Sequence, residues 1–235
     1  MESLLSENKH QNTLDNFEET NTSIIEEISI DCVVFGFNKQ NLEVLLVQHA
    51  EGESKGKWGL LGGWVKTKES TDNAAHRIVF ELTNLNDIYL EQLKAFTDPD
   101  RVISERVITI GYYTLLNRED YNIKAGLKVI EAKWHKINEI PDLIFDHNEI
   151  LNFSLKRLRN RVCQAPVGFT LLPEKFTLLQ LMHLYEEILG VELDKSNFRR
   201  KILHMKLLIP LDEKQKDVSH RAAQLYKFDA EIYTK

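Results

Sequence analysis

Cysteine is scarce in this chain, and the signals of membrane insertion or secretion are missing. Only two cysteines occur among 235 residues, Cys32 and Cys163, far apart and without the spacing of a metal site. We therefore expect reduced thiols in a cytoplasmic protein rather than disulfides or zinc ligands. No apolar run approaches the roughly 20 residues that cross a bilayer. The polar, acidic start of the chain lacks the charged-then-apolar pattern of a secretion signal.

What the sequence does have is a globular composition with an uneven distribution of charge. Hydrophobic residues make up 43% and charged residues 28%, and the length allows two modest domains. A net charge of −6 argues at first against a nucleic-acid partner. The segment 195–227, however, holds nine Lys or Arg against three acids, so it carries +6 and leaves −12 for the rest. This split is typical of a separate module that binds nucleic acid.

Strand and helix patterns alternate through the first 160 residues. Residues 1–24 lack a sustained apolar period and are expected to form a flexible tail. Alternating and helical periodicities predict the following elements. The strands are 28–37, 42–48, 91–96, 106–116 and 131–137, and the helices are 70–83 and 146–162. This mixture predicts an α+β domain over residues 25–163, which we expect to bind an effector.

The pattern changes after a short linker at 164–168, which contains a proline and a glycine. An amphipathic helix is predicted from Thr177, as N-cap, to Leu189, with Gly190 as its stop signal. Asp194 is expected to cap a second helix that runs to about Met205. A β-hairpin of 207–211 and 223–228 follows. Two helices and then a hairpin make the plan of a winged helix-turn-helix domain, here 168–235.

A glycine, a glutamate and an arginine at defined spacing lie just before and within the first predicted helix. The sequence runs Gly63-x5-Glu69-x7-Arg77 and continues from Ile78 to Leu85. It resembles the Nudix box, Gx5Ex7REUxEExGU, in which U is aliphatic. Six positions match without insertion: Gly63, Glu69, Arg77, Val79, Glu81 and Leu85. Three depart from the pattern: Ile78 and Leu82 stand in place of glutamates, and Asn84 in place of glycine.

The resemblance implies a Nudix-type α/β/α sandwich whose catalytic site is degenerate. Nudix hydrolases hold Mg²⁺ on glutamates at positions 78, 81 and 82, which share one face of a helix. Glu81 alone cannot assemble that site, so we expect no catalytic residue, no metal and no cofactor. Glu69 and Arg77, a structural ion pair in the family, are both present. Two alternatives stay open: a Mg²⁺-dependent hydrolase of nucleoside diphosphate derivatives, or a Glu81 that is merely solvated.

The C-terminal part carries a second resemblance. The strings Asn197-Phe-Arg-Arg-Lys201 and Ala223-Gln-Leu-Tyr-Lys-Phe228 are similar to those of the Nudix-related transcriptional regulators, a bacterial family linked to NAD metabolism. Some Bacteroidetes branches of that family control sugar catabolism, one of them in response to arabinose. The resemblance implies a regulator with an effector-binding Nudix domain and a DNA-binding winged helix.

The second helix of this winged helix has an apolar side and a basic side. Phe198, Ile202 and Leu203 are predicted to face inward. Arginine commonly contacts guanine edges in the major groove, and Asn pairs with adenine. The candidate DNA-binding residues are Lys195, Ser196, Asn197, Arg199, Arg200 and Lys206 on the helix, and Lys214, Lys216, His220 and Arg221 in the hairpin loop. The alternatives are a solvated charged helix or a surface that binds another protein.

A regulator also needs an effector site, which we expect beside the box. The candidate effector-binding residues are Trp64, Glu81, Asp98, Arg101 and Arg106. Arg101 or Arg106 could hold a phosphate, although either could equally form a salt bridge. The effector is expected to be an ADP-ribose-like nucleotide or a sugar, and the resemblance to the sugar-catabolic branch, in strings such as Phe145-Asp-His147, favours the sugar. The whole sequence thus predicts a ligand-responsive transcriptional regulator, acting as a homodimer on palindromic double-stranded operator DNA.

Overall fold

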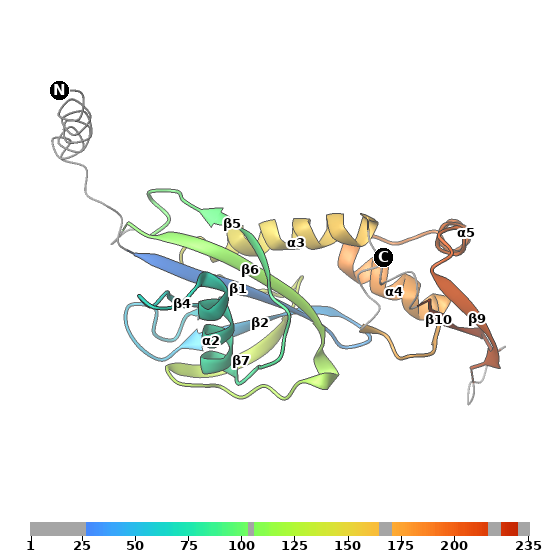
Figure 1. The fold of residues 1–235 in the computed structure, drawn as a ribbon, viewed down its shortest axis with the longest axis horizontal. Coiled ribbons are helices and arrows are strands. Elements are labelled where there is room, and N and C mark those ends of the chain that lie inside the picture. The colour runs from blue at the N-terminus through green and yellow to red at the C-terminus, as the bar shows by residue number, and fades with distance from the viewer. Residues whose placement is uncertain (1–26, 103–105, 165–170, 216–221, 230–235) are drawn as a thin grey trace, which may run out of the picture.

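The computed structural model describes residues 27–102, 106–164, 171–215 and 222–229. They form a layered α+β part and, at the other end of an elongated molecule, a small part with two helices and a short sheet (Figure 1). The predicted tail and most of the predicted linker lie outside the described residues. The α+β class expected from the sequence is confirmed.

A seven-stranded mixed sheet forms the centre of the first part. Its strands are β1 (Ile28–Phe37), β2 (Leu42–His49), β3 (Trp58–Gly59), β4 (Leu61–Trp64), β5 (Glu91–Phe96), β6 (Ile108–Asn117) and β7 (Val129–Lys136). The main order is β3-β2-β1-β6-β5, while β4 also pairs with β1 and β7 with β2. β1 and β6 run parallel along their whole length, and the other pairs are antiparallel. β1 is nearly continuous in apolar residues because it lies at the centre of the sheet.

Two helices cover opposite faces of this sheet (Figure 1). α2 (Thr71–Thr83) packs on the face that includes Cys32 and Val34, and α3 (His147–Gln164) on the face that includes Val33 and Phe35. Successive residues of a strand point to opposite faces, so β1 contributes to both cores. Cys32 is a free buried thiol, and burial raises its pKa well above the usual value. No described helix combines the length and apolarity needed to cross a membrane.

The ends of α2 are set by local hydrogen bonds. Ser70 caps the first turn, since its hydroxyl accepts from the Asn73 N–H at 3.2 Å. Asn84 ends the helix in the left-handed region at φ 60°, and its N–H donates to the Phe80 carbonyl. The Nudix pattern has glycine at this position, and asparagine is among the few other residues that tolerate such a backbone. The turn after the helix is therefore kept despite the substitution.

The second part has the element order of a winged helix. It consists of β8 (Phe176–Thr177), α4 (Leu178–Leu189), α5 (Lys195–His204), β9 (Leu208–Lys214) and β10 (Gln224–Phe228), with sheet order β8-β10-β9. Thr177 and Gln180 form a capping box, and Gly190 ends α4 at φ 69°. Asp194 caps α5 by accepting from the Asn197 N–H at 2.8 Å. These caps agree with the predicted starts of both helices.

One hydrophobic core joins the two parts. Leu181, Leu184 and Ile188 of α4 belong to the same buried cluster as the α3 side of the sheet. Hydrogen bonds cross the junction as well: the Leu42 N–H donates to Glu187 at 3.1 Å, and Arg159 Nε donates to the Ile188 carbonyl at 2.9 Å. The winged helix is thus attached to the sheet through α4.

One inward-facing residue of α5 was predicted wrongly. Ile202 is buried, and Phe198 packs edge-on against Tyr185 with ring centroids 5.6 Å apart, as its inward position requires. Leu203 is instead 37% exposed. It lies beside Ile202 in sequence, about 100° around the helix, so this short helix turns it away from α4.

Candidate functional site

The glutamate and arginine of the box brace the loop before α2. Arg77 donates to both carboxylate oxygens of Glu69, from Nε at 2.9 Å and from Nη2 at 2.5 Å. The same Nη2 donates to the Trp64 carbonyl at 2.9 Å. The Arg77 hydrogen bonds, and secondarily the Lys66 backbone N–H, lower the pKa of Glu69 to about 2. This pair connects the end of β4 to the middle of α2.

Replacing Glu69 by glutamine (E69Q) is expected to lower the melting temperature in a pH-dependent way. A carboxyl with a depressed pKa in the folded state stabilises the protein above its unfolded pKa of about 4.5, and this contribution is lost as the pH falls towards about 2. The difference in melting temperature between wild type and E69Q should therefore be largest at pH 7 and should shrink as the pH falls from about 4.5 to about 2. Thermal melts followed by circular dichroism measure it. The exposed Glu53→Gln control should show no such gap, and a gap independent of pH would contradict the assignment.

The residues at the three metal positions do not fit a magnesium ion. Ile78 is only 2% exposed and packs against the backbone of Gly63, and Leu82 packs against the α2-side core. Glu81 supplies a carboxylate, but it already pairs with Arg77 at 3.0 Å and lies 3.8 Å from Lys66 Nζ. Within the described part of the chain, no three His, Cys, Asp or Glu side chains are grouped to hold a metal. The hard oxygen cluster that Mg²⁺ prefers is not assembled by these side chains.

A cavity of about 240 Å³ lies beside the box loop. Its walls come from β1, from β4, from the segment after β5 and from the start of α3. Trp64 and Arg101, two of the five predicted effector residues, line it. Trp64 is 50% exposed, and Phe145, which also lines the cavity, is similarly exposed. Two aromatic rings are therefore accessible to a ligand at this cavity.

The charged groups that line this cavity, Arg101 and Asp31, belong to a cluster that also includes Asp146. Arg101 donates to Asp146 from Nε at 2.9 Å and from Nη2 at 2.6 Å, and Nη2 lies 3.4 Å from Asp31. Its side chain is only 3% exposed. This is the bidentate geometry of a strong guanidinium–carboxylate pair. Two carboxylates face one guanidinium, so the cluster carries a net charge of −1. The Nε and Nη2 atoms of Arg101 already donate to these carboxylates.

Two histidines complete the cavity wall. His147 accepts the Leu60 N–H on Nδ1 at 2.9 Å, so in the neutral ring the proton is on Nε2, 3.5 Å from Asp31. Burial lowers the pKa of His147 and of His49, which keeps both rings neutral at pH 7. His49 Nε2 is buried and has no hydrogen-bond partner among the described residues. A ligand hydroxyl or N–H group could satisfy it.

Sequence reasoning missed Asp31 and His49, and it noted Asp146 only within the string Phe145-Asp-His147. Asp31 carried a usable signal, since it interrupts the apolar run of β1, and a buried carboxylate requires a partner. The remaining predicted effector residues lie outside the cavity. Arg106 donates to the carbonyls of Thr97 and Asp98 at 3.1 and 3.0 Å and so closes a turn, while Glu81 lies on α2. The structure thus brings together two of the five predicted residues.

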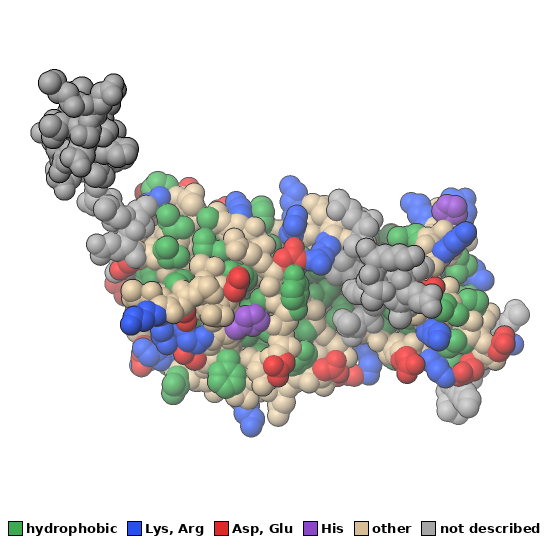
Figure 2. Space-filling view, viewed as in Figure 1, with side chains coloured by type: hydrophobic (Ala, Val, Ile, Leu, Met, Phe, Trp, Pro, Cys, Tyr) green, Lys and Arg blue, Asp and Glu red, His purple; other side chains and the backbone are tan. Residues whose placement is uncertain are grey.

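The predicted DNA-binding residues on α5 are accessible. Five of the six predicted residues lie on α5 and Lys206 follows its C-cap; all six are exposed, as is Lys214 at the end of β9. Figure 2 shows basic side chains gathered at the end of the molecule where α5 lies. Within the described residues, no ion pair joins a carboxylate to Lys195, Arg199 or Arg200. Arg200 donates instead to Asn197 at 2.9 Å. The predicted wing residues Lys216, His220 and Arg221 lie outside the described residues.

Fold and sites together define a class of protein: a Nudix sandwich without the acidic cluster, attached to a winged helix with a basic second helix. Comparison with known families agrees. The NUDIX domain matches residues 26–153, and the NrtR DNA-binding winged helix domain matches residues 168–228. The chain belongs to the family that joins these two domains.

Individual relatives share this organisation. The chain is 30% identical over 210 residues to the ADPR responsive transcriptional repressor NtrR of Acinetobacter baylyi, covering 88% of this chain and 83% of that protein. It is similar to Shewanella oneidensis NrtR complexed with a 27mer DNA, with TM-score 0.70 and 28% identity over 88% and 95% of the two chains. The NUDIX domain of that NrtR complexed with ADP ribose gives TM-score 0.53 and 26% identity over 63% and 97%. None of these relatives supports the resemblance to the arabinose-responsive branch.

Proposed function

We propose that this protein is an effector-responsive transcriptional regulator that binds operator DNA through α5 and the hairpin of β9 and β10. The observation that carries the proposal is the row of exposed cations on α5, which no described carboxylate neutralises. These cations lie in the winged helix, and a similar solved structure is an NrtR complexed with DNA. In this role Arg199 and Arg200 would contact base edges or phosphates, and the residues of the hairpin loop would contact phosphates.

We further propose that the effector binds in the cavity beside the box and is not hydrolysed. The relatives favour an ADP-ribose-like ligand, since one is ADPR responsive and another is a NUDIX domain complexed with ADP ribose. Trp64 would stack on the ligand, while Arg101 orders the floor of the cavity. Binding without turnover is supported by the buried Ile78 and the paired Glu81 at the metal positions.

One observation favours a sugar as the second candidate effector. One carboxylate, Asp31, and one guanidinium, Arg101, line the cavity, and Arg101 is already paired with Asp31 and Asp146. Both histidines are neutral. Among the described lining residues no cation is left unpaired for a diphosphate, whereas the carboxylate of Asp31 and the unpartnered Nε2 of His49 can accept hydrogen bonds from hydroxyl groups. A free sugar, or the terminal ribose of a larger ligand, would fit this part of the cavity.

We also propose that the protein acts as a homodimer on DNA, because winged-helix regulators commonly recognise palindromes with two-fold symmetry. An effector could then alter operator affinity by changing the spacing of the two α5 helices. This requires that the effector bind the two arrangements with unequal affinity. The core that runs from the sheet into α4 is a physical route for such coupling.

Selection from a pool of random DNA duplexes, followed by effector titration, tests these proposals together. We expect an inverted repeat bound by two chains, and binding that weakens steeply with salt. ADP-ribose should then change the operator affinity between about 5-fold and 150-fold, the range of ordinary allosteric coupling. Arabinose is the matched probe for the sugar class. A stable single chain on the selected DNA would contradict the dimer.

Assaying the mixtures of protein and ADP-ribose for products distinguishes a regulator from a hydrolase. With Mg²⁺ and ADP-ribose present, no AMP should form. Turnover of about 1 s⁻¹, the low end of ordinary enzymes, would support the hydrolase alternative. Binding that is indifferent to DNA and to salt would instead favour a protein-interaction surface.

A further inference from the structure

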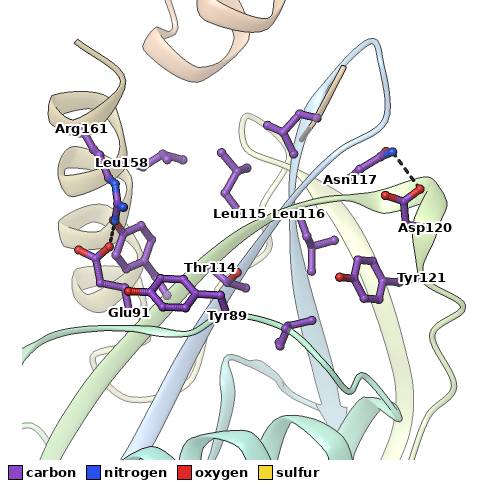
Figure 3. A pocket seen from close by; sticks show the side chains of 13 residues that line it. Tyr89, Glu91, Thr114, Leu115, Leu116, Asn117, Asp120, Tyr121, Leu158 and Arg161 are labelled. Carbon is purple, nitrogen blue, oxygen red and sulfur yellow. Dashed lines mark hydrogen bonds and ion pairs between the residues drawn. The ribbon is translucent and has the colours of Figure 1, made fainter. Parts of the chain in front are cut away.

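We propose that a second small-molecule site lies at the junction of the two domains and takes a planar, uncharged heteroaromatic ligand of nucleoside size. A cavity of about 360 Å³ lies between β6, the C-terminal half of α3 and Leu171, close to where the winged helix begins (Figure 3). It shares no lining residue with the cavity beside the box. Its volume lies within the range of about 300–1,000 Å³ typical of ligand pockets. The site goes beyond the proposed function.

An open strand edge forms one wall of this cavity. β6 extends to Asn117, but its pairing with β5 ends at Tyr113. Residues 114–117 line the cavity, and no described strand pairs with them on that side. Such an edge presents N–H and C=O groups that lack a ladder partner. A heteroaromatic ring carries a donor and an acceptor side by side on its rim, so it can take the place of a neighbouring strand.

Aromatic and aliphatic side chains flank this edge. Figure 3 shows Tyr89 and Tyr121 on different sides of the hollow, with Leu115 and Leu158 above the strand. Tyr89 is 74% exposed, so most of its ring is free to take a ligand. Nucleobases stack on such rings with little dependence on their identity, because every base has a π-face. The wall composition therefore favours a flat ligand over a branched one.

The charges of the lining favour a neutral ligand over a nucleotide. Glu91 is paired with Arg161, and Arg157 lies 3.4 Å from it. Asp120 accepts from the Asn117 side-chain amide at 3.1 Å. The lining thus holds two carboxylates and one guanidinium, and that guanidinium is already neutralised. A phosphate would therefore find no unpaired cation in the lining, whereas an uncharged base needs none.

Calorimetric titration of the full chain with adenosine, in the absence of DNA, tests the proposal. We expect saturable binding, weaker binding of AMP, and a Tyr89→Ala variant that binds adenosine at least about fivefold more weakly, the effect of losing one base–aromatic stack. Tyr121→Leu, which keeps bulk but removes the ring, should weaken binding similarly. Phe80→Ala, which removes an exposed aromatic ring outside both cavities, is the matched control and should bind as wild type.

Two outcomes would overturn the site. The first is an absence of heat from wild type at millimolar adenosine. The second is loss of adenosine binding in Trp64→Ala with full retention in Tyr89→Ala, which would put the nucleoside in the cavity beside the box. Tyr89 is largely exposed, so its replacement is not expected to affect folding, and unchanged circular dichroism checks this. Operator binding is measured separately, so failure of this site leaves the regulatory proposal standing.

Discussion

The double variant R199A/R200A is expected to bind the selected operator at least about 30-fold more weakly than wild type. A well-placed arginine contact with DNA contributes about 1–3 kcal/mol, and two such losses at the lower limit already give this factor. Both side chains are exposed on α5. If they contact phosphates rather than bases, the slope of log affinity against log salt should also fall by nearly two. Fluorescence anisotropy titrations at several salt concentrations measure both quantities.

The matched control removes two exposed positive charges from the Nudix domain. Lys57 and Lys68 are both exposed there, so K57A/K68A changes the net charge by the same amount. It should bind the operator nearly as tightly as wild type, because the change lies far from the proposed interface. Equal losses in the two variants would mean that only the overall charge matters, and the assignment of α5 would fail. Both variants should melt at the wild-type temperature.

Replacing Arg101 by alanine is expected to lower the free energy of unfolding by about 3–5 kcal/mol, the usual cost of removing one partner from a buried ion pair. The variant leaves the carboxylates of Asp31 and Asp146 facing each other without their shared cation. It also removes the donor that Thr109 accepts from at 2.5 Å. Urea denaturation at neutral pH measures the loss.

Arg106 provides a control of the same residue type. It is exposed, and it donates to the backbone carbonyls of Thr97 and Asp98. Arg106→Ala should therefore cost no more than about 1.5 kcal/mol, the scale of ordinary hydrogen bonds. If the two variants were equally destabilised, the buried cluster would not be the stabilising feature that its geometry indicates.

Features that depend on near neighbours could be predicted closely. Thr177 and Asp194, the two predicted caps, each bond an N–H three residues ahead, so the pattern is complete within one turn. Strand β5 has the predicted limits for a similar reason, since alternation along a strand is visible in the sequence itself. In contrast, β3, β4 and β8 are only two to four residues long and were not predicted. Such short segments become strands only through their partners.

The cavity beside the box could be predicted only in part. Trp64 is adjacent to the box and could be named from it, but Arg101 binds Asp31 and Asp146, which are 70 and 45 positions away. One sequence offers no way to tell which distant acid an arginine will meet. The choice between a phosphate ligand and an internal salt bridge was therefore open until the strands were placed. The parallel pairing of β1 with β6 was beyond prediction for the same reason.

The sequence by itself determined which chemical groups exist: a single carboxylate at the three metal positions, and a concentration of positive charge after residue 195. Those are properties of residue identity and spacing, and folding cannot add a missing carboxylate. Only the tertiary structure decided which groups are free to act. It neutralised Arg101 inside the protein, left the cations of α5 exposed, and ended the pairing of β6 with β5 at Tyr113, before the end of β6. Those outcomes depend on contacts between segments far apart in the chain, because burial and pairing are set by packing rather than by local sequence.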